Sequence, residues 1–148
     1  MPALCDGNFL VALSHGGHQH HAKAKDWFDA GGADAGLVLC RVSQLGLLRL
    51  LTNPAIMKDE VCTTDWAWAT HDRMMQDARF SYREEAPELQ TKLREYTKGF
   101  PFSPKLWQDA YLAAFAVSIG LGLVTFDQGF DKFEGLRPEI LHVSNGVT

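Results

Sequence analysis

The sequence predicts an α/β fold, with a central, mostly parallel sheet of four to five strands flanked by helices on both faces. Short apolar runs alternate along the chain with longer amphipathic segments, an order that is typical of right-handed βαβ units. The 148 residues suffice for one compact domain and are too few for two ordinary ones. We therefore expect a single domain over residues 1–148.

The first strand and the helices that follow it are indicated by local signals. Residues 3–5 are apolar and form the first expected strand. A helix begins near Asn8, whose side-chain oxygen can cap it. A second helical stretch, from His18 to Asp29, stops at Gly31-Gly32, because glycine readily adopts the left-handed conformation that ends many helices.

The second strand is the continuous apolar run 36–40, as expected for a strand that is covered on both faces. A helix follows at once, with Ser43 as its expected cap and Asn53-Pro54 as its end. Residues 63–65 then open a further helix that runs to about Ala78.

The remaining elements complete an alternation of helices and strands. Residues 79–83 alternate weakly, as in a short strand. A charged, exposed helix is expected over 88–98. After it the pattern predicts a helix, a strand and a last short strand at residues 107–119, 121–126 and 140–143.

The composition excludes several classes of protein. Hydrophobic residues at 46% and charged residues at 22% match ordinary globular usage, and apolar runs such as 111–117 fall well short of the roughly 20 residues that a membrane span needs. The N-terminus does not resemble a signal peptide, so we expect a cytoplasmic protein. The net charge of −4 gives no overall footprint for nucleic acid. Any such contact must be local, through a basic patch or a metal.

The cysteines predict neither a disulfide framework nor a zinc site. There are three, an odd number without metal-type spacing. Cys5 and Cys40 lie in strand-like runs, so we expect both to be buried, reduced thiols.

Three aspartates lie where the strand ends of a parallel fold come together. Asp6 closes the first strand, Asp127 closes the run 121–126, and Asp109 opens the apolar helix between them. Ligands of open parallel sheets bind beyond the carboxyl ends of the strands. Oxygen-only ligands suit Mg²⁺ or Mn²⁺, which in such sites activate water against a phosphodiester.

Taken singly, each aspartate also has an ordinary structural explanation. Asp6 can cap a helix, Asp109 is favoured in a first turn by the helix dipole, and Asp127 can be a turn residue beside Gly129. Their sequence blocks strengthen the joint interpretation. Residues 4–13, 40–54, 109–113 and 123–127 resemble the four blocks of PIN-domain ribonucleases, and particularly the toxins of VapBC-type toxin-antitoxin pairs.

The resemblance implies a PIN-like three-layer sandwich that cleaves RNA with Mg²⁺ or Mn²⁺. Asp6, Asp109 and Asp127 fall on the metal-binding acids of the family. The resemblance further implies a type II toxin-antitoxin pair in which a small antitoxin protein inhibits the enzyme. It also implies a homodimer.

Gln44 departs from the family pattern, because many members have a glutamate at this position. Its amide oxygen can still bind a metal or accept from water, so Gln44 remains a candidate catalytic residue. The loss of one negative charge should weaken metal affinity. The alternative is therefore a catalytically weakened PIN-like domain that binds RNA or a partner.

Further polar residues have both functional and structural explanations. Thr125 and Ser43 are candidates to hydrogen-bond the ligating acids, although a strand threonine and a capping serine are also ordinary. Lys105 and Arg49 are candidate phosphate contacts, with solvated surface charge as the simpler explanation. An unrelated carboxylate phosphohydrolase would need an aspartate where Asn8 stands.

Two clusters invite weaker hypotheses. His15, His18, His20 and His21 suggest zinc, but no cysteine or acid lies nearby in the sequence, so we favour a polar helix start. An aromatic and methionine group on the helix after residue 63 suggests a base-stacking surface, with core or dimer packing as the preferred explanation. Its members are Trp66, Trp68, Met74 and Met75.

Overall fold

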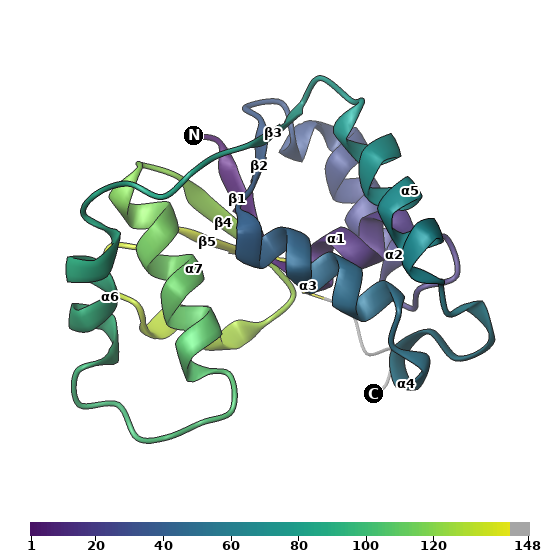
Figure 1. The fold of residues 1–148 in the computed structure, drawn as a ribbon. Helices are drawn as coiled ribbons and strands as arrows, with labels where there is room; N and C mark the ends of the chain where they lie inside the picture. The colour runs from purple at the N-terminus through teal and green to yellow at the C-terminus, as the bar shows by residue number, and fades with distance from the viewer. Residues whose placement is uncertain (143–148) are drawn as a thin grey trace.

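The computed structural model describes residues 1–142 and contains one five-stranded parallel sheet (Figure 1). The strand order is β3-β2-β1-β4-β5, so the first strand lies at the centre. Leu4 pairs with Val38 on one side and with Leu123 on the other. The strands are β1 (Ala3–Cys5), β2 (Leu37–Leu39), β3 (Phe80–Tyr82), β4 (Gly122–Thr125) and β5 (Pro138–Ile140).

Helices cover both faces of the sheet, which confirms the predicted three-layer α/β sandwich. Figure 1 shows α6 and α7 on one side and α1, α2 and α5 on the other. The α-helices are α1 (Gly7–Ser14), α2 (His21–Trp27), α3 (Arg41–Leu51), α4 (Pro54–Met57), α5 (Thr64–Met75), α6 (Leu89–Thr97) and α7 (Leu106–Ser118). Shorter helical turns are η1 (Phe28–Gly32), η2 (Lys58–Glu60) and η3 (Gln128–Lys132).

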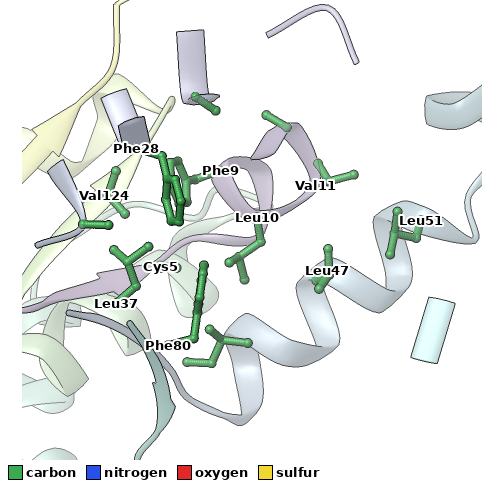
Figure 2. Close-up of a cluster of buried hydrophobic side chains, with 14 of the residues drawn as sticks. Cys5, Phe9, Leu10, Val11, Phe28, Leu37, Leu47, Leu51, Phe80 and Val124 are labelled. Atoms are coloured by element: carbon green, nitrogen blue, oxygen red, sulfur yellow. The ribbon is translucent and has the colours of Figure 1, made fainter. Parts of the chain in front are cut away.

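The core is divided by the sheet into two hydrophobic clusters. Cys5 and Val124 belong to the cluster under α1 and α3, where Figure 2 shows Phe9 and Leu10 near them and Leu47 farther along on α3. Neighbouring strand residues such as Leu4, Val38 and Leu123 point into the second cluster, under α6 and α7. Side chains alternate along a strand, so continuous apolar strands are needed to fill both clusters. Cys5 and Cys40 are buried free thiols, as predicted.

Two helix caps were predicted wrongly, for the same reason. Only one residue separates β1 from α1 and β2 from α3, so each helix begins earlier than expected. Asn8 consequently lies inside α1, and its amide reaches Thr125 and Phe126 instead of a helix N–H. Ser43 lies inside α3, buried 3.5 Å from the Cys40 sulfur.

Other boundaries agree with the sequence within a few residues. Thr63 caps α5 by accepting from the Trp66 N–H at 3.2 Å, as its position predicted. That helix ends at Met75 rather than near Ala78. The last strand lies at 138–140, earlier than the predicted 140–143, and Val143 is outside the described residues.

Two glycines allow α1 and α3 to cross in close contact beside the sheet. A Cβ atom added to Gly7 would lie 3.0 Å from the backbone carbon of Gly46. Any larger residue at position 7 would push the helices apart and displace Asp6, which immediately precedes it. None of the helices within residues 1–142 has the length and apolar character that crossing a bilayer requires.

Candidate functional site

Asp6 is fixed where the neighbouring strands β1 and β4 end. Cys5 is paired with Val124, and the Asp6 N–H donates to the Val124 carbonyl at 3.0 Å. The Thr125 hydroxyl donates to Asp6 Oδ2 at 2.8 Å. Only 6% of Asp6 is exposed. The parallel pairing therefore brings the first aspartate against the end of β4, as the sequence predicted.

Thr125 connects two of the three predicted acids. Its oxygen also accepts the backbone N–H of Asp127 at 2.9 Å. Asn8 supports the same turn, because its Oδ1 accepts the Phe126 N–H at 3.2 Å and its Nδ2 lies 3.4 Å from the Thr125 oxygen. The predicted hydrogen bond from Thr125 to an acid is confirmed. The corresponding prediction for Ser43 is wrong, since its hydroxyl contacts Cys40.

The Asp127 carboxylate has two partners of its own. Its Oδ1 accepts the Gly129 N–H at 2.8 Å, which fixes the turn at the start of η3. Its Oδ2 lies 3.5 Å from the ammonium of Lys105, an exposed side chain. The lysine therefore supplies positive charge beside the acids while remaining accessible to solvent.

Asp109 lies in the first turn of α7 and is also 6% exposed. Burial raises the pKa of its carboxyl group to about 6, with further contributions from the charges of Asp127 and Asp6. Burial likewise raises the pKa of Asp6, and the Asp127 charge adds to this rise, although the Thr125 hydroxyl and the Gly7 N–H oppose it. Three acids thus share one electrostatic environment, which we call the acid site (Asp6, Asp109 and Asp127).

The donor atoms and the charge of the acid site are those that a hard divalent cation prefers. The site offers oxygen donors, which suit Mg²⁺ or Mn²⁺, and it concentrates negative charge that raises the pKa of its own members. No hydrogen bond from another residue in the range 1–142 reaches the Asp109 carboxylate, which leaves it free to turn toward a cation. As the side chains stand, no three His, Cys, Asp or Glu residues in this range are arranged to hold one metal ion.

Gln44 belongs to a different polar cluster, which we call the Gln44 corner (Gln44, Arg41 and His71). Gln44 is 7% exposed, and its Oε1 accepts from Arg41. Its Nε2 lies 3.2 Å from His71 Nε2, and His71 Nδ1 lies 2.9 Å from Asp72. Because the amide nitrogen can only donate, His71 Nε2 accepts and the neutral ring carries its proton on Nδ1. The amide is therefore satisfied without any contact to the acid site.

Sequence reasoning missed Arg41 and His71. Arg41 directly follows the end of β2, a signal that was visible in the sequence. His71 is 27 residues from Gln44, and only the packing of α5 on α3 brings the two together. Arg49, proposed as a phosphate contact, lies with Trp68 along a groove between these helices, apart from the acids.

Two of the four clustered histidines have partners outside the cluster, and one of these partners is an acid that the sequence did not reveal. His15 Nε2 contacts Glu60, and His21 Nδ1 lies 2.8 Å from the Ala12 carbonyl. The aromatic group on α5 divides in two. Trp66 and Trp68 are exposed, so core packing is the wrong explanation for them and dimer packing stays a prediction. Met74 and Met75 are partly buried and pack against the hydrophobic core.

The matches to known proteins agree with this architecture. The PIN domain family matches residues 3–136, so the chain belongs to the PIN-domain family. Ribonuclease VapC41 of Mycobacterium tuberculosis is 36% identical over 142 residues, covering 93% of this chain and 97% of the relative. Ribonuclease VapC38 of the same organism is 30% identical over 145 residues, covering 93% of each chain.

Solved structures share the fold at lower identity. VapBC2 from Rickettsia felis, bound to a DNA fragment from its promoter, matches with a TM-score of 0.67 at 15% identity, over 96% of this chain and 100% of the other. VapC20 from Mycobacterium tuberculosis, a Sarcin-Ricin loop cleaving toxin, matches with a TM-score of 0.63 at 18% identity, over 92% and 99%. At these identities the likeness concerns the fold alone.

Proposed function

We propose that this protein is an endoribonuclease and the toxin of a VapBC-type toxin-antitoxin pair. The observation that carries the proposal is the acid site, in which the ends of β1 and β4 and the first turn of α7 contribute carboxylates to one environment. Relatives at 30% and 36% identity that are named ribonucleases support the assignment.

The proposed metal ligands are Asp6, Asp109 and Asp127. A divalent cation, Mg²⁺ or Mn²⁺, supplies when bound an activated water and a positive charge opposite the scissile phosphate. Thr125 holds Asp6 and the backbone of Asp127 in register. Asp109, with its raised pKa, loses its proton more readily once a cation offsets its neighbours. Lys105 is placed to contact the phosphate from the side of Asp127.

The second candidate function is a weakened PIN domain that binds RNA or a partner without turnover. The Gln44 corner favours it, because the amide oxygen that stands in place of the family carboxylate already accepts from Arg41. Calorimetric titration with Mn²⁺ separates the two functions. Tight binding by the wild type counts against the weakened domain.

We propose a small antitoxin protein as the partner, since structures of VapBC complexes are among the fold matches. Its inhibitory segment would cover the acid site. We further propose a homodimer and a cytoplasmic location. The free thiols Cys5, Cys40 and Cys62 are compatible with a reducing compartment.

The experiment is a cleavage assay on a structured RNA pool with Mg²⁺ or Mn²⁺. Wild type should cleave, Asp6→Asn should not, and Asp131→Asn, which alters an exposed aspartate of η3, serves as the matched control. Equal cleavage by wild type and Asp6→Asn would refute the assignment.

A further inference from the structure

A hollow of about 760 Å³ lies beside the acid site and is not used by the proposed chemistry. The loop with His15, His18 and His20 forms one wall, and Lys58–Glu60 forms another. Asn8 and Phe126 line the side toward the acids. Asn8 Nδ2 also lies 3.4 Å from the Thr125 oxygen, and the Thr125 hydroxyl donates to Asp6 at 2.8 Å, so a residue that lines the hollow connects it to the acid site.

Two aromatic rings form a stack in this hollow. His20 packs on Phe126 with ring centroids 5.0 Å apart and planes inclined by 25°. Asn8 accepts the backbone N–H of Phe126, and this hydrogen bond fixes the position of the Phe126 ring relative to the acids. His20 Nδ1 is buried, and no residue in the described part of the chain forms a hydrogen bond with it. Such orphaned polar groups cost stability and call for an explanation; the His20 ring is held by stacking alone.

The neighbouring ring presents neutral polar edges. His18 Nδ1 accepts the His20 N–H at 3.0 Å, so the proton of neutral His18 lies on Nε2. Burial lowers the pKa of His18, and the nearby His20 and His15 lower it further. This wall of the hollow therefore offers flat rings and the neutral polar edge of His18.

The rim of the hollow disfavours phosphate. Asp59 and Glu60 line it together with one lysine, Lys58. Lys58 has a φ of 53°, a conformation that is uncommon for residues other than glycine and is often found at functional sites. His15 also contacts Glu60, so the rim offers no excess of positive charge that would hold a phosphate group, whereas a neutral base needs none.

We propose that this hollow binds one base of the RNA, next to the phosphate that is cleaved, by stacking on the His20–Phe126 pair. The proposal rests on the proposed ribonuclease function and adds a base-binding subsite to it. Proteins that read single-stranded RNA stack unpaired bases on aromatic and histidine side chains. The hydrogen-bonding edge of the base meets the neutral His18 ring.

The first test uses single-stranded RNA in which one nucleotide at a time, on either side of the mapped cleavage site, lacks its base. For wild type, one abasic position should lower kcat/KM about tenfold, as expected for loss of one stacked base. In His20→Ala the intact RNA should already be cleaved more slowly, and the same abasic position should have no further effect. A penalty that persists unchanged in His20→Ala, or that no position produces in wild type, overturns the subsite.

Two further variants separate stacking from folding. His20→Phe keeps a ring and should retain most of the abasic penalty, whereas His20→Asn keeps a polar group and should lose it. His142→Ala removes an exposed histidine that does not line the hollow and should behave as wild type. Matching thermal unfolding of these variants checks that the fold is intact.

A binding measurement distinguishes failure of the subsite from failure of the ribonuclease assignment. Trinucleotide RNAs carrying 2-aminopurine at each position in turn are titrated with protein in the Asp6→Asn background with Mn²⁺, so that bound RNA is not consumed. Fluorescence quenching that disappears with His20→Ala supports the base site, even if wild type cleaves no RNA. Cleavage by wild type without His20-dependent quenching overturns the base site and leaves the ribonuclease assignment intact.

Discussion

The acid site and the Gln44 corner follow the ends of neighbouring strands, yet they satisfy their polar groups in opposite ways. In the acid site, burial and mutual repulsion raise the pKa values of Asp6 and Asp109. In the Gln44 corner each polar atom of the amide has a partner, Arg41 on one side and His71 on the other. The acid site needs a cation from outside the chain to offset its negative charge. The Gln44 amide already has all of its partners within the chain. The position of a polar residue directly after a strand therefore does not by itself make that residue a ligand.

Asp109→Asn should have a large effect on activity, second to that of Asp6→Asn. Removal of a ligand charge should lower RNA cleavage by about 100-fold or more, measured as kcat/KM with Mn²⁺. An exposed aspartate elsewhere, Asp131→Asn, is the control. Cleavage at the wild-type rate would mean that Asp109 is only a helix-dipole residue.

The same variant should become more stable, which gives a prediction independent of activity. The folded pKa of Asp109, about 6, exceeds the ordinary value of 3.8, so the unfolded chain releases this proton first as the pH rises. Stability is therefore lost between pH 4 and about 6, and above that range the penalty is on the order of 1–3 kcal/mol. Chemical denaturation without divalent ions should give Asp109→Asn a larger free energy of unfolding than wild type at pH 7. The two free energies should converge near pH 4.

Thr125→Val tests whether the hydroxyl organises the acid site. The change conserves volume but removes the donor to Asp6 and the acceptor for the Asp127 N–H. Loss of such supporting contacts typically costs about 10- to 100-fold in metal affinity or activity. Mn²⁺ calorimetry and cleavage rates should fall together; Thr125→Ser, which restores the hydroxyl, should recover most of the loss.

Lys105→Ala should have a smaller effect. The ammonium is exposed and 3.5 Å from Asp127, so its interaction is screened by solvent. We expect KM for RNA to rise about three- to tenfold with little change in kcat, since phosphate contacts of this kind mainly support binding. Lys23→Ala, which removes an exposed lysine of α2, provides a matched loss of charge. A change in kcat alone would contradict a phosphate-binding role.

Gln44→Glu should have the smallest effect. It tests directly whether the Gln44 corner is separate from the acid site. Arg41 already contacts the side-chain oxygen, so a new carboxylate would pair with this cation instead of strengthening the acid site. Mn²⁺ affinity should change by less than about threefold. A large gain would show that the Gln44 corner opens toward the metal and would favour the weakened-domain function for the wild type.

The strand ends that carry Asp6 and Asp127 could be predicted from sequence, because the apolar runs before them are local and continuous. The sequence made Thr125 and Ser43 equal candidates to hydrogen-bond an acid, and only the packed structure distinguishes them, because Thr125 contacts Asp6 and Ser43 contacts Cys40. The role of Asn8 could not be predicted, since it depends on α1 beginning one residue after β1 ends. The pairing of Gln44 with His71 and of His15 with Glu60 depends on how separate helices and loops pack, and no periodic pattern encodes that.

The central position of β1 has a consequence for biosynthesis. Asp6 is made early, but its hydrogen-bond partner Thr125 follows 119 residues later, on the strand that pairs with β1. A growing chain can therefore bury its first aspartate only after nearly all of the sheet has been synthesised. For the proposed ribonuclease, this means that the acid site is completed only when nearly the whole fold is present.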